Sequence, residues 1–353
     1  MIDWFTGDLP IDASNLSLDH IIEVSRHGEK IYDIEKWLQV EGSYSSSIQL
    51  RRANPSPGII DWCKSYDITA PQSILQFSGN PTKWLQGQNC YGPVYDQLLP
   101  VMSDVVDRLP SDIRVEGIQG PVETRRIDLT IMVDLESHNR VHEWLRQAAD
   151  RSRSRHGRPL VSGSTVYWGS KHGWGLKAYC KYCELEAHPF MDLKLNKEFQ
   201  KAVETQLRLE LTLRTRELKE HEQISEDLVW SYFDRVELGM MKSTTLLNGG
   251  DLPISSLMVY RAWLEGYPVV HELKKRQMYR HRRRILDEVG VDICSSPVGI
   301  RSSTAPIIMD QEYLHQHEVK DVPDVFKPYM WRPWEESDLD SGFGRSGAPA
   351  LKV

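Results

Sequence analysis

Two segments of this chain alternate strictly between apolar and polar residues, and this alternation constrains the fold more than any other feature. The segments are ETRRIDLTIMVDLES at 123–137 and QLRLELTLRTREL at 206–218. A period of two places alternate side chains on opposite faces, so each segment predicts a β-strand with one apolar face. On its other face each strand presents an acid near an arginine: Asp128 after Arg126, and Glu210 after Arg208. One such acid is usually a solvated residue, but two strands of the same pattern favour a shared site.

A third segment, GSKHGWGLKAYCKYCELE at 169–186, predicts the second strand of a hairpin that starts at STVYWGS and turns at its glycines. Tyr179 and Lys181 share one face of that strand. Glu184 has the opposite parity, so it joins them only if a helix begins near Lys181. A tyrosine among basic side chains and near a carboxylate can attack a phosphodiester. Tyr182 is a second candidate nucleophile, and we interpret Tyr167 as a packing residue.

The segments before these strands are less regular. Residues 18–31 predict a helix-like or mixed element, and the sequence becomes strand-like from Tyr44. The segment 80–92, NPTKWLQGQNCYG, predicts a surface loop with exposed amides. The alternative is a loop whose aromatic residues stack on single-stranded bases. Residues 93–110 have apolar side chains at helical spacing and predict an amphipathic helix.

Beyond residue 250 the sequence becomes helical and basic. Two helical stretches are separated at Gly266, Tyr267 and Pro268, which is the outline of a helix-turn-helix DNA-binding unit. A charged surface helix without a partner is the alternative, but the charges are almost all positive. These candidate DNA-binding residues are Lys274, Lys275, Arg276, Arg280, Arg282, Arg283 and Arg284.

Composition limits the other interpretations. The net charge of −7 means that any contact with DNA must come from local basic patches. No apolar run approaches the roughly 20 residues that cross a bilayer, and the acidic start does not resemble an export signal, so we expect a cytoplasmic protein without a membrane partner. The five cysteines predict reduced thiols. Cys180 and Cys183 lack a second cysteine pair, so we interpret them as buried thiols.

Taken together, four motifs resemble the replication initiators of filamentous phages, the gene II/X family, and more distantly the Rep_trans-type rolling-circle initiators. The C-terminal segments YRAWLEGY and MYRHRRRILDEVGVDI resemble the small domain that follows in many phage members. The motifs are NPTKWLQGQNCYG at 80–92, RRIDLT at 125–130, LKAYCKYCELE at 176–186 and LRLELTLRTREL at 207–218. The histidine-hydrophobic-histidine motif of many rolling-circle nucleases is not present on a predicted strand.

The resemblance implies an enzyme that nicks and rejoins the plus strand at a phage origin with the help of a divalent metal. It implies Tyr179 as nucleophile, with Lys181 beside it, and Asp128, Glu184 and Glu210 as ligands of Mg²⁺ or Mn²⁺. Arg126 and Arg208 would contact phosphate. The partners would be origin DNA, double-stranded and displaced, with a host helicase and polymerase.

The fold expected from the patterns and the resemblance is α+β. A curved antiparallel sheet in two related halves, residues 20–115 and 116–245, would carry packed helices on one face. We expect a nicking domain at 1–250, a helical DNA-binding domain at 251–304 and a flexible tail at 305–353. A non-catalytic origin-binding protein or repressor is the alternative function, and an unrelated host α+β protein is a third. A pure binder would not need Tyr179 and the three acids together.

Overall fold

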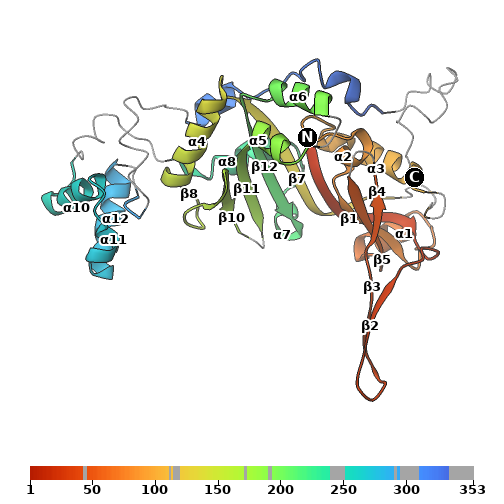
Figure 1. Cartoon of the computed structure of the whole chain (residues 1–353). Helices are drawn as coiled ribbons and strands as arrows, with labels where there is room; N and C mark the ends of the chain where they lie inside the picture. The colour runs from red at the N-terminus through yellow and green to blue at the C-terminus, as the bar shows by residue number, and fades with distance from the viewer. Residues whose placement is uncertain are drawn as a thin grey trace.

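A nine-stranded antiparallel sheet forms the centre of the molecule, which confirms the expected α+β class (Figure 1). The computed structural model describes residues 1–42, 46–110, 113, 120–170, 173–189, 193–238, 251–289, 292–294 and 310–333. The strand order is β4-β5-β6-β1-β7-β12-β11-β10-β9. The strands are β1 (Ile2–Asp12), β4 (Leu38–Glu41), β5 (Ser47–Ala53), β6 (Ile74–Gly79), β7 (Glu123–Asp134), β9 (Leu160–Ser162), β10 (Thr165–Gly169), β11 (Trp174–Cys180) and β12 (Gln206–Arg214). Short pairs add β2 (His20–Val24) with β3 (Lys30–Glu35), and β8 (Ser152–Arg153) with β13 (Glu237–Leu238).

The two alternating segments are the neighbouring strands β7 and β12, as predicted. Glu210 lies opposite Thr130, and Thr212 lies opposite Asp128. The odd-numbered side chains from Ile127 to Val133 and from Leu207 to Leu213 are buried in the main apolar core. The polar side chains therefore share the opposite face of the sheet.

The first strand of the chain, β1, was not predicted, although it lies in the middle of the sheet between β6 and β7. Ile2 and Phe5 are both fully buried in the core, although they are three residues apart. A regular strand would place them on opposite faces. The register with β7 shifts between Ile2 and Trp4, and this irregularity turns Asp3 away from the core.

Helices cover the core. Those of the body are α1 (Pro57–Ser65), α2 (Pro81–Gln86), α3 (Leu98–Asp107), α4 (His138–Arg151), α5 (Lys181–Ala187), α6 (Leu193–Ala202), α7 (Thr215–Leu218) and α8 (Asp227–Phe233), with 3-10 turns η2 (Tyr95–Gln97) and η4 (Lys327–Tyr329). Buried apolar residues of α3, α4 and α8 pack with those of the strands. Helix α5 begins at Lys181, directly after β11, which is the change of structure that Glu184 requires to join Tyr179.

The predicted surface loop at 80–92 is instead a buried helix and turn. Asn80 caps α2 and accepts a hydrogen bond from the backbone N–H of Lys83, Pro81 occupies the first turn, and Gly87 ends the helix at φ 76°. Gln86 and Gln88 are buried because their side-chain amides donate to backbone carbonyls of the same turn. The prediction of exposed amides was wrong. The side-chain amides are buried because they bond backbone groups of the turn that have no backbone partner.

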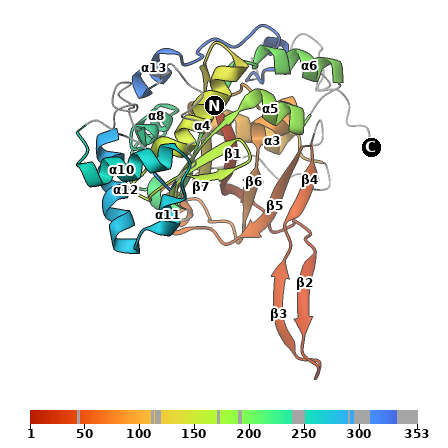
Figure 2. The ribbon, with the colours of Figure 1, turned by 60° about the vertical axis from the view of Figure 1, so that its left-hand side comes forward.

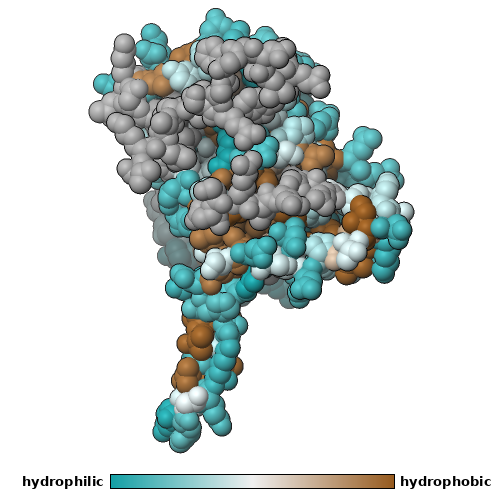
Figure 3. All heavy atoms as spheres, turned by 90° about the vertical axis from the view of Figure 1, so that its right-hand side faces the viewer, coloured by the Kyte–Doolittle hydropathy of each residue, from teal (hydrophilic) through white to brown (hydrophobic). Residues whose placement is uncertain are grey.

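The helix-like interpretation of residues 18–31 was also wrong. These residues form the β2–β3 hairpin, which projects from the body (Figures 1 and 2). Several large apolar side chains are exposed along it, and Figure 3 shows groups of hydrophobic atoms among hydrophilic ones on the projecting segment. They are Ile21, Ile22, Val24, Ile31, Tyr32 and Ile34.

The C-terminal region contains a separate helical group, α10 (Ile254–Leu264), α11 (Val269–Glu272) and α12 (Lys275–Val289), with its own small apolar core. The expected flexible tail includes 310–333, and these residues pack on the body instead. Helix α13 (Gln311–Gln316) buries Leu314, and Val319 donates a backbone hydrogen bond to Met132 at 2.8 Å. Within the described ranges, no helix has the length and apolar character that crossing a bilayer requires.

Replacing residues 21–34 with Asn-Gly should leave the fold intact. His20 and Glu35 pair directly, so a two-residue turn can join them, and the removed side chains are mostly exposed. We expect a change of no more than about 0.5 kcal/mol in the free energy of unfolding, measured by urea denaturation. Leu209→Ala, the control for a core loss, should cost about 2–5 kcal/mol. A similar cost for both variants would show that the hairpin supports the core.

Candidate active site on the polar face of the sheet

The polar face of β7, β11 and β12 gathers most of the predicted site residues. Across β11 and β12, Lys177 lies opposite Glu210, and Tyr179 lies opposite Arg208. Directly opposed side chains of an antiparallel pair lie on the same face. Asp128 is a diagonal neighbour of Glu210 on β7, a relation that spans roughly 7–8 Å between Cα atoms.

Glu210 is the central carboxylate of this face. Its Oε1 lies 2.7 Å from Lys177 Nζ, and its Oε2 accepts a hydrogen bond of 3.2 Å from the Tyr179 hydroxyl. Burial and the charges of Asp3 and Asp128 raise the pKa of Glu210 to about 7, against the opposing effect of Lys177. Crowded negative charge therefore makes Glu210 a proton acceptor that titrates near neutral pH.

Tyr179 is held as a neutral phenol. Its side chain is nearly buried, at 8% exposure, and this burial raises the pKa of Tyr179 well above its usual value, although the Arg208 charge opposes the rise. Lys177 Nζ lies 5.5 Å from the centre of the tyrosine ring. Burial acts to lower the Lys177 pKa, but the charge and hydrogen bond of Glu210, together with the charges of Asp3 and Asp128, raise it. A positive charge thus lies near the oxygen that would become nucleophilic.

Arg208, which lies directly opposite Tyr179, is fully buried. Its guanidinium lies 2.9 Å from Asp3 Oδ1 and donates to Thr130 Oγ1 and to the backbone carbonyl of Asn89. Burial acts to lower the Arg208 pKa, but the nearby Tyr179, Asp3 and Glu210 raise it. Burial likewise acts to raise the pKa of Asp3, and Arg208 and Lys181 hold it below its usual value. Arg208 was predicted to contact DNA, but its burial assigns it to support of the site.

Lys181 and Glu184 form a second pair in the first turn of α5, with the lysine fully buried and the glutamate partly so. Lys181 Nζ donates to Glu184 Oε2 at 2.6 Å and to Asn89 Oδ1 at 3.0 Å. Asn89 in turn donates to Asp3 Oδ1 at 2.9 Å, as does Asn80. Burial of Glu184 acts to raise its pKa, but Lys181 holds it below its usual value. The turn at 87–92 therefore connects β1 with α5.

Asp128 is buried and bound by Arg126 through two hydrogen bonds, of 2.9 and 2.6 Å. The Arg126 side chain is 37% exposed, and its guanidinium lies 5.5 Å from the centre of the Trp4 ring. The Arg126–Asp128 pair lies at the edge of the site next to β1, and the Arg126 guanidinium reaches solvent.

Comparison with known proteins identifies the family of the chain. The family model for the N-terminal part of the gene II replication-associated protein matches residues 1–239, well over half of the chain. The chain belongs to the gene II replication-associated protein family. It is 28% identical over 334 residues to the gene II replication-associated protein of Enterobacteria phage I2-2, and the match covers 87% of this chain and 92% of that protein. The resemblance to the gene II family of filamentous phages is thus confirmed.

In this gene II family member, the structure brings Tyr179, Glu210 and Asp128 to one face, and connects Lys181 and Glu184 to them through Asn89 and Asp3. Within the described residues, Asp128, Glu184 and Glu210 do not form a preformed ligand group, because each is bound to a different cation. Sequence reasoning missed Lys177, which has the same strand parity as Tyr179 and could have been found. It also missed Asp3 and Asn89, which carry no local signal.

The two rival tyrosines have different surroundings from Tyr179. The ring of Tyr182 is 4.9 Å from the ring of His138 and packs against the main core. Tyr167 is 39% exposed on β10 and lies opposite Lys177. This exposure follows from the position of β10 near the edge of the sheet.

The basic residues of the C-terminal domain are mostly exposed. Helix α12 buries Met278, His281, Ile285 and Val289 and leaves its arginines outward. Arg282 is the exception, because it binds Asp292 through hydrogen bonds of 2.9 and 2.7 Å. The exposed members are Lys274, Lys275, Arg276, Arg280, Arg283 and Arg284. In this gene II family member, their role in DNA binding stays a prediction.

Asp3→Asn should destabilise this gene II family member strongly. The change removes the counter-charge of a buried guanidinium, which costs about 3–5 kcal/mol. Urea denaturation measures the free energy of unfolding. Asp12→Asn, at the exposed end of the same strand, is the matched control and should change stability by no more than about 0.5 kcal/mol. Equal effects of the two changes would contradict a special role for the Asp3–Arg208 pair.

Proposed function

We propose that this protein initiates rolling-circle DNA replication by nicking the plus strand at a phage origin, with Tyr179 as the nucleophile. One observation carries the proposal: in a member of the gene II family, the Tyr179 hydroxyl donates to a buried carboxylate beside a lysine. A tyrosine whose proton has an acceptor in place can attack without first becoming a free phenolate.

The reaction forms a bond between the Tyr179 oxygen and phosphorus, and breaks the bond between phosphorus and the 3′ oxygen of the DNA. The Tyr179 proton passes to Glu210 Oε2, its hydrogen-bond acceptor. The departing 3′ oxygen takes up a proton and becomes a hydroxyl, which primes synthesis by a host polymerase as a host helicase opens the duplex. Attack of a 3′ hydroxyl on the phosphotyrosine reverses these steps and rejoins the strand.

The cations of the site divide into two groups by exposure. Lys177 and Arg126 have side chains that are 33% and 37% exposed, so they are placed to contact the scissile phosphate. Lys181 and Arg208 are fully buried and act through their charge and by positioning their partners. Positive charge fixed before the reaction stabilises the additional negative charge of the pentacoordinate transition state.

The residues present also fit a divalent metal. Asp128, Glu184 and Glu210, with Asp3 as a further candidate, offer the hard oxygen ligands that Mg²⁺ and Mn²⁺ prefer. The crowding of carboxylates that raises the pKa of Glu210 to about 7 is an arrangement that a cation would relieve. When bound, the ion would polarise the phosphate. Ligation requires Arg126, Lys177 and Lys181 to release their carboxylates, and it leaves the two exposed cations, Arg126 and Lys177, free for DNA.

The C-terminal helices would supply origin recognition. Helices α10, α11 and α12 follow the segment that the family model covers, and α12 presents arginines on its exposed side. A basic helix of this kind contacts phosphates and base edges in the major groove. We therefore assign nicking to residues 1–250 and duplex binding to the helical domain at 251–304.

Tyr179→Phe should abolish nicking and leave origin binding unchanged, because only the nucleophilic oxygen is removed. The assay is conversion of a supercoiled plasmid carrying the phage intergenic region to open circles, with Mg²⁺, Mn²⁺ or EDTA. Tyr182→Phe is the matched control and should retain nicking, because Tyr182 contacts His138 instead of the carboxylates. Nicking by Tyr179→Phe would disprove its role, and binding without nicking by the wild type would support a non-catalytic origin-binding protein.

Replacing Arg280 and Arg283 with Ala should weaken binding to origin duplex DNA and reduce its dependence on salt. Each lost phosphate contact lowers the slope of log K against log salt concentration by about 0.9, so we expect a fall of about 2. Fluorescence anisotropy over a series of salt concentrations measures the slope. Gln277→Ala, an exposed change on the same helix, is the uncharged control. An unchanged slope in the double variant would exclude phosphate contact by this helix.

A further inference from the structure

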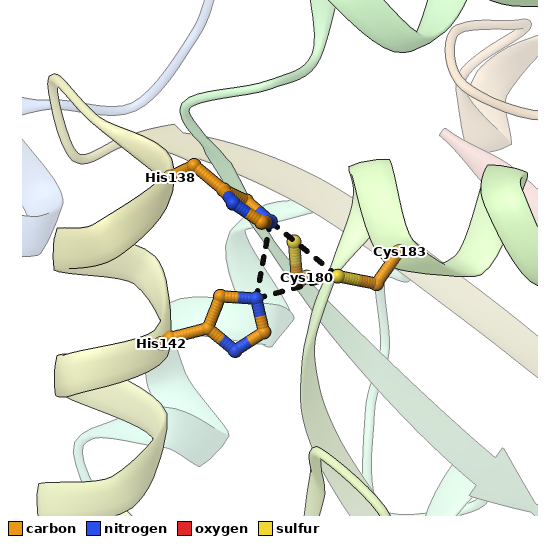
Figure 4. Close-up of side chains that lie close together, drawn as sticks. All are labelled: His138, His142, Cys180 and Cys183. Atoms are coloured by element: carbon orange, nitrogen blue, oxygen red, sulfur yellow. Dashed lines mark hydrogen bonds between the residues drawn. The ribbon is translucent and has the colours of Figure 1, made fainter.

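Two histidines and two cysteines converge beside the strand that carries Tyr179 (Figure 4). His138 and His142 extend from α4, Cys180 ends β11, and Cys183 lies in the first turn of α5. One ligand atom from each residue lies within 4.8 Å of all the others. None of the four takes part in the carboxylate network described above.

The spacing in the chain explains the convergence. His138 and His142 are four residues apart on a helix, so their rings leave from the same face. Cys180 and Cys183 are separated by two residues, across the change from strand to helix. A histidine pair of the form H-x₃-H and a cysteine pair of the form C-x₂-C make a combination found in structural zinc sites. The second pair that the cysteines lack in sequence is supplied by histidines.

The distances among the ligand atoms of His138, His142 and Cys183 fit a tetrahedral ion, and Cys180 Sγ lies within 4.8 Å of all three. His138 Nε2 lies 3.1 Å from His142 Nε2 and 3.4 Å from Cys183 Sγ, and Cys183 Sγ lies 3.3 Å from His142 Nε2. Zinc bonds of about 2.0–2.1 Å to nitrogen and 2.3 Å to sulfur place tetrahedral ligand atoms roughly 3.3–3.8 Å apart. Hydrogen bonds between pairs of these groups would not by themselves require all four ligand atoms to point toward a common centre.

We propose that His138, His142, Cys180 and Cys183 bind one structural zinc ion. Thiolate and imidazole ligands select zinc over the magnesium or manganese expected at carboxylates. Four protein ligands complete the tetrahedron and leave no position for a substrate, which is typical of a structural site. The site is therefore distinct in position and chemistry from the carboxylates of the polar face.

The position of the zinc site gives it a mechanical role. Cys180 lies between Tyr179 and Lys181 in sequence, and Cys183 directly precedes Glu184. Helix α4 is anchored in the core by Val141, Trp144 and Leu145. The ion links the junction of β11 and α5 to α4. It thereby fixes the backbone that presents Tyr179, Lys181 and Glu184 on the opposite face of the sheet. This role, unlike zinc binding itself, rests on the proposed function.

Zinc content tests the proposal directly. The full chain, produced in zinc-supplemented medium and purified without chelators, should contain about one zinc per chain by inductively coupled plasma mass spectrometry. Cys183→Ser and His142→Ala should contain close to none. Cys294→Ser, which changes a partly buried cysteine near Asp292, is the matched control and should retain the ion. Tyr179→Phe should also retain it, so zinc binding and nicking are measured independently.

Cobalt provides a test that does not depend on the folding of variants. Wild-type protein stripped of metal and titrated with Co²⁺ should develop the intense visible absorption of tetrahedral cobalt and the near-ultraviolet band of thiolate-to-cobalt charge transfer. One equivalent of zinc should abolish both bands. Metal-free wild type that gives no such spectrum, or a Cys180–Cys183 disulfide in protein purified under nitrogen, would overturn the proposal. Retention of zinc by both ligand variants would overturn it as well.

Discussion

The ion pair between Asp3 and Arg208 is the contact on which the rest of the site depends. A guanidinium with no exposed surface is tolerated in the middle of a sheet only if its charge is balanced. Asp3 supplies the charge, and it reaches Arg208 only because the register of β1 shifts beside β7. Asn89 and Thr130 accept further bonds from Arg208, so the turn at 87–92 and strand β7 are fixed by the same group. Tyr179 then lies directly opposite Arg208 on the neighbouring strand.

The site as a whole is a set of exchangeable ion pairs. Four buried or partly buried carboxylates each have a partner: Asp3 with Arg208, Asp128 with Arg126, Glu184 with Lys181 and Glu210 with Lys177. Such a set keeps the polar face stable without a ligand, since an unpaired buried charge is strongly unfavourable. Under the proposed function, a metal and a phosphate that bind together would exchange partners with the existing pairs instead of adding charge to an empty site. The exposed cations, Lys177 and Arg126, are the ones able to move.

The strength of each signal in the sequence determined what could be predicted. The alternation in β7 and β12 is local and regular, so both strands and the shared face of Asp128 and Glu210 were predicted correctly. Glu184 has the opposite strand parity to Tyr179, so it could join Tyr179 only if a helix began near Lys181. Helix α5 does begin there. Strand β1 was missed because the shift near Asp3 interrupts its alternation, and no pattern in the chain links Asp3 to Arg208. The amides at 86–89 were misread as surface residues, because polar side chains that satisfy a buried turn look the same in sequence as solvated ones.

The histidines of α4 and the cysteines of β11 and α5 are far apart in the chain, and only the packing of α4 on the sheet brings them together.

The central place of β1 also sets the order in which the molecule can be completed during synthesis. Asp3 is made before β6 and β7, and Arg208 comes much later. At ~5–20 residues per second, on the order of ten seconds or more separates the two members of this pair. During that interval β1 can pair with β6 and then β7, but the carboxylate of Asp3 lacks its ion-pair partner Arg208. The last strand of the centre to emerge, β12, brings Arg208 and Glu210 together, so a nascent chain has its candidate site only when most of the sheet has left the ribosome.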